Sequence, residues 1–148
     1  MNVYYYECYP RIVREIKAGG PMTIEESRSL DATFRSRLET GALSFQTCSQ
    51  AHAVFPPRPV CPTCGSTELT WGESEGHGTI YSATTISPRG VDPYTVVVVD
   101  IDEGFRMMSR LDGEDALNAK IGDRVVTDIR PAAADGEPLP FVRLEATR

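Results

Sequence analysis

The sequence predicts a mainly β protein with one N-terminal helix, on the basis of three observations. Beyond Gly76, five strand-like segments of five to nine residues are separated by turn residues. Two further strand-like segments flank turns that contain cysteines, and one earlier stretch has apolar residues at helical spacing. With 148 residues, 41% of them hydrophobic, the chain can bury one core or two small units that share one.

Composition excludes some classes of protein. No apolar run approaches the roughly 20 residues that a membrane-spanning helix needs, and the first 22 residues contain no apolar stretch like that of a signal peptide. We therefore expect a cytoplasmic protein, in which reducing conditions argue against structural disulfides. The 15 basic and 21 acidic side chains, a net charge of −6, disfavour a nucleic-acid partner.

Residues 23–41 are expected to form an amphipathic helix that runs from Ile24 to about Thr40. A T-x-x-E capping box begins it. An apolar stripe at i+4 spacing follows, formed by Leu30, Phe34 and Leu38. Residues 1–22 are predicted to be an irregular arm. Because Met22 directly precedes the capping box, the sequence leaves open whether residues 1–21 belong to the native protein.

Residues 42–75 have the outline of a zinc ribbon. Alternating apolar residues predict a strand over 42–47 that leads into Cys48. The sequence Cys61-Pro-Thr-Cys64-Gly65 is a knuckle in which two thiolates can converge on one ion, and a short strand over 68–71 follows it.

Zinc is the predicted cofactor of this segment, with Cys48, Cys61 and Cys64 as ligands. A regular ribbon would have a further cysteine at position 51, where this chain has Ala51. Tetrahedral zinc takes four ligands, and His52 is the nearest candidate for the fourth. A water ligand, or an empty site whose cysteines are small buried apolar residues, stays open. Ala51 disfavours an iron site, because such a site needs four thiolates. Cys8 is remote in the sequence and is not expected to bind the metal.

Residues 76–148 are predicted to form a five-stranded barrel. The expected strands are Thr79 to Ile86, Tyr94 to Asp102, Phe105 to Leu111, Arg124 to Arg130 and Leu139 to Glu145. A helical turn is expected within residues 112–122, and five strands with a helical insert after the third match an OB-type barrel. The run Val96 to Val99 is apolar on both faces, so we expect the ribbon or a partner to cover that strand.

Several motifs in this order resemble one family of proteins. They are Gly41-Ala-Leu43, the strand before Cys48, Phe55-Pro-Pro-Arg-Pro-Val-Cys-Pro-Thr-Cys-Gly-Ser66, Gly76-His-Gly-Thr-Ile-Tyr-Ser82, Asp102-Glu-Gly104 and Ile121-Gly-Asp-Arg-Val125. The family comprises bacterial and archaeal two-part proteins in which a rubredoxin-like zinc ribbon is joined to an OB-fold domain associated with acyl-CoA. The resemblance covers about residues 24 to 145, and Ala51 departs from the family's four-cysteine ribbon.

The resemblance implies an accessory subunit that helps to hold acyl-CoA for a thiolase-like or related condensing or hydratase enzyme, and that supplies no catalytic nucleophile. The residues themselves agree, because neither histidine lies in a nucleophile motif. Whether the chain is an enzyme on its own is left open, with a noncatalytic subunit favoured. The alternative is a zinc-ribbon and OB-fold protein that binds nucleic acid; a standalone hydrolase lacks a triad.

Arg58 and His77 are the candidate substrate-binding residues. Arg58 stands between two prolines on a stiff loop, where a guanidinium can meet a CoA phosphate. His77 lies between two glycines, where a ligand can approach, although a plain turn residue fits the same pattern. Phe55, Trp71 and Tyr81 could offer a face to adenine, but we interpret them as core residues that join the ribbon to the barrel.

Overall fold

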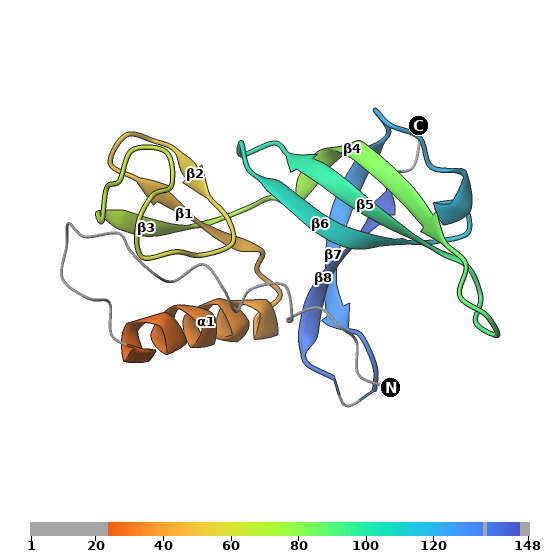
Figure 1. The fold of residues 1–148 in the computed structure, drawn as a ribbon, viewed down its shortest axis with the longest axis horizontal. Coiled ribbons are helices and arrows are strands. Elements are labelled where there is room, and N and C mark those ends of the chain that lie inside the picture. The colour runs from red at the N-terminus through yellow and green to blue at the C-terminus, as the bar shows by residue number, and fades with distance from the viewer. Residues whose placement is uncertain (1–23, 135, 146–148) are drawn as a thin grey trace.

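The computed structural model describes residues 24–134 and 136–145, with side chains from Leu30 onward. A helix lies beneath a small three-stranded sheet, and a closed five-stranded barrel stands beside them (Figure 1). The first part consists of α1 (Ile24–Glu39), β1 (Ser44–Cys48), β2 (Ala53–Val54) and β3 (Leu69–Glu73). The barrel consists of β4 (His77–Ile86), β5 (Tyr94–Ile101), β6 (Arg106–Asp112), the 3-10 helix η1 (Ala116–Asn118), β7 (Arg124–Pro131) and β8 (Pro138–Leu144).

This architecture confirms the predicted fold class of a helix, a ribbon segment and a five-stranded OB-type barrel. The domain limits at residues 41/42 and 75/76 stay predictions. The expected arm of residues 1–22, with Cys8, lies outside the described residues.

The helix α1 ends where the sequence predicts. Gly41 lies just past it with φ +83°, and its N–H donates to the carbonyl of Leu38 at 2.9 Å, which closes the last turn. On the exposed side, Arg35 pairs with Asp31 at 2.8 Å and also with Glu137 in the connection between β7 and β8. The second pair links the helix to the barrel. Within the described residues, no helix is both long and apolar enough to cross a membrane.

The ribbon sheet has the order β2-β1-β3, and both of its pairings are antiparallel. The strands β1 and β3 were predicted, each with ends displaced by no more than two residues. The strand β2 was not predicted, because a two-residue strand is too short to show an alternating pattern. Pairing of Thr47 with both Ala53 and Thr70 makes β1 the central strand, and β1 ends at Cys48.

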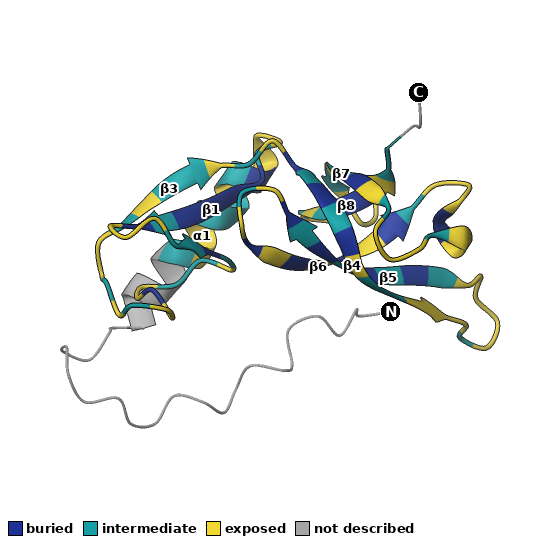
Figure 2. Cartoon of the chain, turned by 90° about the horizontal axis from the view of Figure 1, so that it is seen from above, coloured by how far each residue is buried: buried dark blue, intermediate teal, exposed yellow. Residues whose placement is uncertain are grey.

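The barrel closes in the order β4-β5-β6-β8-β7, with every pairing antiparallel except the parallel one between β6 and β8. All five predicted strands are present, with ends displaced by no more than two residues, and η1 is the expected helical turn. Residues of β5 and β6 alternate between buried and outward-facing positions, as period-2 strands of a barrel must. Figure 2 shows this alternation as bands of buried and less buried residues along the barrel strands.

Aromatic rings join the helix, the ribbon and the barrel. The ring of Phe55, which follows β2, stacks on Phe105 at the start of β6, with centroids 4.8 Å apart. Phe45 of β1 lies 5.1 Å from Phe105, and Phe34 of α1 meets Phe55 edge-on at 5.8 Å. The interpretation of Phe55 as a joining core residue is thus confirmed.

The same interpretation is wrong for Trp71 and Tyr81. Trp71 is half-buried in β3 and lies under the guanidinium of Arg37 in α1, 5.1 Å from the ring centroid. Tyr81 is 52% exposed on the outside of the barrel, where Arg106 covers it at 3.5 Å. Neither residue therefore lies in the junction between ribbon and barrel.

The outer face of β5 is not covered by the ribbon within the described residues. Val97 and Val99 point into the barrel core, whereas Val96 and Val98 lie half-buried on the outside. Val98 is paired with Met108 of β6, which is 56% exposed. Of the two covers expected for this strand, the ribbon or a partner, the ribbon lies elsewhere, held by α1 and the aromatic junction, and a partner stays a prediction.

Replacement of Phe105 by Ala is expected to lower the free energy of unfolding by about 3–5 kcal/mol, because it removes a buried ring that contacts two others. Urea unfolding would be followed by far-UV circular dichroism and by the fluorescence of Trp71, the one tryptophan, which reports the ribbon. The control Met108→Ala, on the exposed side of the same strand, should cost less than about 1 kcal/mol. Equal losses in the two variants would contradict the role of the aromatic junction.

Candidate metal centre

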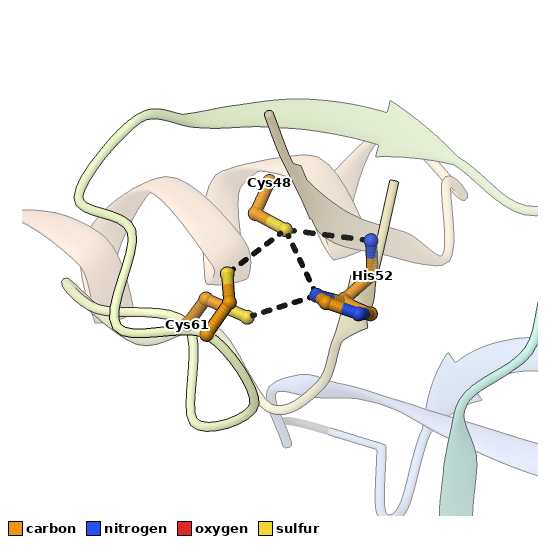
Figure 3. Close-up of side chains that lie close together, drawn as sticks. Cys48, His52 and Cys61 are labelled. Atoms are coloured by element: carbon orange, nitrogen blue, oxygen red, sulfur yellow. Dashed lines mark hydrogen bonds between the residues drawn. The ribbon is translucent and has the colours of Figure 1, made fainter. Parts of the chain in front are cut away.

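Four potential metal ligands converge at one end of the ribbon sheet. Cys48 ends β1, His52 lies in the turn that follows, and Cys61 and Cys64 lie in the turn before β3. One ligand atom from each residue lies within 4.8 Å of all the others. Figure 3 shows the imidazole of His52 pointing toward the thiols of Cys48 and Cys61. The structure thus brings together all four residues that the sequence singled out.

Short-range backbone bonds shape the turn that carries Cys61 and Cys64. The N–H of Gly65 donates to the carbonyl of Cys61 at 2.9 Å, and the N–H of Cys61 donates to the carbonyl of Ser66 at 2.8 Å. Gly65 has φ +74°, a conformation that favours glycine. The sequence Cys-Pro-Thr-Cys-Gly therefore forms the predicted knuckle.

The spacing of the sulfur atoms fits tetrahedral zinc. Zn–S bonds of about 2.3 Å give tetrahedral S···S edges of about 3.8 Å, and the thiols of Cys48 and Cys64 are 3.7 Å apart. Cys48 and Cys61 are buried, whereas Cys64 is half-buried. Leu69 and Val54 pack around these three cysteines and form a small apolar cluster of their own.

The thiols also have unequal pKa values. Burial by itself raises the pKa of Cys61, but hydrogen bonds from the backbones of Cys64 and Thr63 and from the neighbouring thiols lower it to about 6. A backbone hydrogen bond from Ser66 lowers the pKa of Cys64, yet burial and the nearby Cys61 and Cys48 raise it above its usual value. The lowered pKa of Cys61 favours its thiolate, which is the form that binds zinc.

The ribbon's cofactor is zinc, as the sequence predicts, and these residues suit a structural role for it. If all four residues bind the metal, no position would stay open for a substrate or a reactive water, unlike in a catalytic zinc site. The metal would instead hold together two turns that belong to different parts of the chain.

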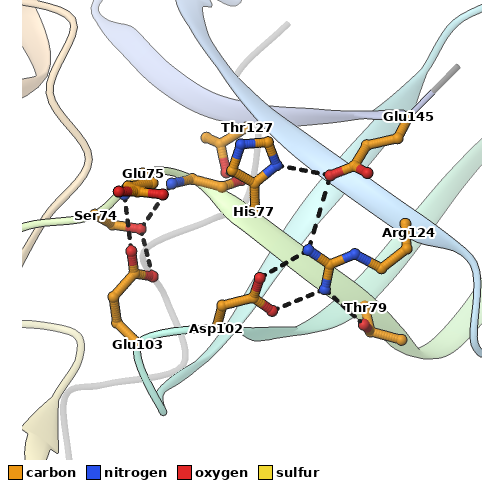
Figure 4. A network of polar contacts seen from close by, with 10 residues as sticks. Ser74, Glu75, His77, Thr79, Asp102, Glu103, Arg124, Thr127 and Glu145 are labelled. Carbon is orange, nitrogen blue, oxygen red and sulfur yellow. Dashed lines mark hydrogen bonds and ion pairs between the residues drawn. The ribbon is translucent and has the colours of Figure 1, made fainter.

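A second polar network surrounds His77 at the start of β4. Its Nδ1 forms a hydrogen bond with Glu145 at 2.6 Å, and its side chain is 45% exposed (Figure 4). Arg124 of β7 donates two bonds to the carboxylate of Asp102, at 2.8 and 2.7 Å, and one to Thr79 at 3.1 Å. The network spans the seam where β4 pairs with β7 and thereby helps to close the barrel.

Gly78, the residue after His77, lets β4 pack closely against β5. A Cβ atom at Gly78 would lie 2.6 Å from Val99 Cγ1 and 2.7 Å from the carbonyl oxygen of Asp100. No side chain fits there without a shift of the backbone. This close approach of β4 to β5 explains Gly78 without any ligand.

Glu103 fixes the linker between ribbon and barrel, a role that sequence reasoning missed. Its carboxylate accepts a hydrogen bond from the hydroxyl of Ser74 and another from the N–H of Glu75, both at 2.8 Å (Figure 4). In the sequence, Asp102 and Glu103 have only the pattern of acidic residues at a hairpin tip. No local pattern could have revealed partners that lie more than twenty residues away in the chain.

Arg58 and His77 lie in different parts of the molecule. Arg58 is half-buried in the ribbon loop, where its backbone N–H donates to the side-chain oxygen of Gln46 at 2.7 Å. His77 belongs to the barrel and pairs with Glu145. The assignment of both residues to substrate binding stays a prediction.

Removal of zinc is expected to loosen the ribbon before the barrel unfolds, because the metal would hold together the two turns of the ribbon. Purified protein should contain about one zinc per chain by elemental analysis. A chelator should then change the fluorescence of Trp71 in β3 at a lower temperature than the barrel's circular dichroism signal. Cys61→Ser should abolish zinc retention and Cys8→Ser should not; loss in both variants would contradict the proposed ligand set.

The pair of Asp102 with Arg124 should make stability depend on acidic pH. Hydrogen bonds from Arg124, helped by its charge, outweigh partial burial and hold the pKa of Asp102 below its usual range. Its contribution is therefore complete above the unfolded pKa of about 3.9 and is lost as pH falls through the lower folded value. Urea unfolding of the natural protein and of Asp102→Asn should differ most near neutral pH and converge in acid. A difference that grows on acidification would contradict this assignment.

Two family models match consecutive parts of the chain. The model described as "ChsH2, rubredoxin-like zinc ribbon domain" matches residues 35–70. The model described as "ChsH2, C-terminal OB-fold domain" matches residues 71–130.

Known proteins share the same two parts. A "DUF35 domain-containing scaffold protein" of Pyrococcus furiosus is 30% identical over 97 residues, which are 60% of this chain and 71% of that protein. The "3-oxo-4,17-pregnadiene-20-carboxyl-CoA hydratase alpha subunit" of Mycobacterium tuberculosis is 27% identical over 128 residues, 76% of this chain but only 41% of the relative. A solved chain of the "Ltp2-ChsH2(DUF35) aldolase" superposes with a TM-score of 0.67 and 30% identity, covering 77% of this chain and 93% of that one. This protein is therefore a member of the ChsH2-like DUF35 family, in which a rubredoxin-like zinc ribbon is followed by an OB-fold domain.

Proposed function

We propose that this protein is an accessory subunit that helps to hold acyl-CoA for a thiolase-like, condensing or hydratase partner enzyme. The observation that carries the proposal is the shared architecture with a chain of the Ltp2-ChsH2(DUF35) aldolase, nearly the whole of which this protein covers. The name of the hydratase alpha subunit supports the same class of partner. Because this chain spans 41% of that relative, the relative's own activity is not carried over.

The positions of the two histidines support catalysis by the partner. His52 points into the metal cluster, and His77 is engaged with Glu145. A nucleophilic mechanism needs a hydroxyl or thiol held by a free base. Within the described residues, the two thiols in contact with a histidine, those of Cys48 and Cys61, both belong to the candidate zinc site. The bond-making groups are accordingly assigned to the partner.

The surface between ribbon and barrel supports a binding site that the partner completes. A depression of about 290 Å³ there is lined by Gly41, Leu43, Ser74, Glu75, Gly76, Thr127, Asp128 and Ile129. Ligand sites usually occupy 300–1,000 Å³ and are largely apolar, whereas this depression carries two carboxylates that would repel CoA phosphates. Arg58 and His77 are proposed to contribute their side chains to a cleft that forms only against the partner.

The outer face of β4, β5 and β6 suits contact with a protein. Two arginines there lie over tyrosines, Arg106 over Tyr81 and Arg110 over Tyr94, beside the exposed Met108. Tyrosine, arginine and methionine are enriched in protein interfaces, and lysine is depleted. We propose that this face meets the partner enzyme.

A nucleic-acid ligand fits the same face less well. OB folds bind single strands through aromatic residues set among cations. Here Arg106 is paired with Asp100 at 2.5 Å and Arg110 with Asp112 at 2.9 Å, so the local charge is largely neutralised. Binding of a fluorescent single strand that weakens steeply with salt would favour this alternative.

The isolated chain is expected to show little or no turnover of acyl-CoA thioesters, with activity appearing when the partner copurified from native cells is added. In the complex, Arg58→Ala and His77→Ala should raise the KM for acyl-CoA while assembly is retained. Robust turnover by the isolated chain that Arg58→Ala abolishes would show that the protein is itself an enzyme.

A pair of variants locates the docking face in the same preparation. Met108→Asp should weaken association with the partner at least about tenfold, or about 1.4 kcal/mol, because a charge enters an apolar contact. Leu117→Asp is the matched control, since Leu117 is 52% exposed on η1 and Met108 is 56% exposed on β6. If both variants bind equally well by size-exclusion or calorimetric titration, the partner meets another face.

A further inference from the structure

The two turns that carry the metal cluster differ in length by one residue. In the second turn, Cys61 is joined through backbone hydrogen bonds to Gly65 and Ser66, four and five residues later. In the first turn, the N–H of Ala51 donates to the carbonyl of Cys48 at 2.8 Å, and the N–H of Cys48 donates to the carbonyl of His52 at 3.1 Å. The same pair of bonds therefore closes one residue earlier in the first turn.

Each turn contains one residue with a left-handed (positive φ) backbone, and this residue comes one position earlier in the first turn than in the second. In the second turn it is Gly65, which follows the ligand candidate Cys64, with φ +74°. In the first turn it is Ala51, with φ +62°, the one non-glycine residue of positive φ in the described part of the chain. Ala51 is also exposed to solvent, whereas the thiols of Cys48 and Cys61 are buried. In this conformation of the turn, position 51 is therefore poorly placed to supply a ligand.

His52, the residue after Ala51, lies where the fourth ligand of the cluster is needed. His52 Nδ1 lies 3.4 Å from the Sγ of Cys48 and 3.8 Å from the Sγ of Cys61. Tetrahedral zinc with Zn–S of about 2.3 Å and Zn–N of about 2.0–2.1 Å has S···N edges of about 3.5–3.6 Å. Nδ1 is one bond further from the backbone than a cysteine sulfur, which suits a ligand on a shortened turn. The backbone N–H of His52 also lies 3.4 Å from the Sγ of Cys48.

We infer that Nδ1 of His52 is the fourth zinc ligand, supplied by a first turn whose backbone hydrogen bonds close one residue earlier than those of the second, although its two ligands lie one residue further apart in the sequence. Zinc is then held by three thiolates and one neutral imidazole, and the proton of that ring stays on Nε2. The group carries one negative charge fewer than a four-cysteine site would. This assignment concerns the ribbon alone and does not rest on the proposed function.

X-ray absorption at the zinc edge, together with nitrogen NMR of the histidine rings, tests the assignment on the full-length protein loaded with zinc. The expected result is three sulfurs and one imidazole nitrogen, with the metal on Nδ1 of His52 and a proton on Nε2. Three sulfurs with one oxygen, or metal bound through Nε2, would overturn it.

Variants test the ligand and the turn separately. His52→Ala should weaken zinc binding at least about tenfold in a chelator competition, since loss of groups that merely orient a ligand already costs 10–100-fold. The matched control is His77→Ala, the other histidine of the chain, which should retain the natural affinity. Ala51→Cys should still give three sulfurs and one nitrogen, because that position faces solvent. A shift to four sulfurs in Ala51→Cys, or unchanged affinity in His52→Ala, would refute the assignment.

Discussion

The stacked contact between Phe55 and Phe105 determines how the two parts of the protein sit together. One ring comes from the loop between the two cysteine turns and the other from the start of β6, and Phe34 and Phe45 extend the contact to the helix and to β1. Buried aromatic pairs combine a large apolar area with a preferred geometry. The ribbon is thereby fixed against the barrel mainly through carbon contacts, to which the Arg35–Glu137 pair and the bonds of Glu103 to the linker add.

The barrel and the helix could be predicted from the sequence because their signals are local. Where one face of a strand is buried, apolar residues alternate with polar ones along it, as in β6. Gly104, with φ +91°, marks the hairpin between β5 and β6. Long-range pairs have no such signal. The bond of Arg124 to Asp102 and the clamp of Glu103 on Ser74 join residues that only the closed barrel brings together. Their carboxylates therefore looked like ordinary solvent-facing residues.

The cluster of four candidate ligands was predictable from the sequence, whereas the backbone conformation that places His52 in it was not. Cys48, Cys61 and Cys64 stand at ribbon spacing, and His52 was the nearest group that could replace the missing thiol. Whether it does so depends on the backbone of Ala51, and a left-handed alanine is not predictable from composition, since alanine rarely adopts that conformation. The signal that remained was indirect: an alanine at the expected ligand position, followed at once by a histidine.

A structural metal in this position still has a consequence for ligand binding. Arg58 belongs to the loop between the two cysteine turns, so a metal held by both turns would tie that loop at its two ends. Phe55 anchors the same loop to the barrel, and the bond from Arg58 N–H to Gln46 anchors it to β1. Each restraint lowers the conformational entropy that the loop would otherwise lose when a ligand binds. Zinc would thus influence the affinity for acyl-CoA at the proposed site of Arg58 without touching the ligand, by holding the loop in one conformation.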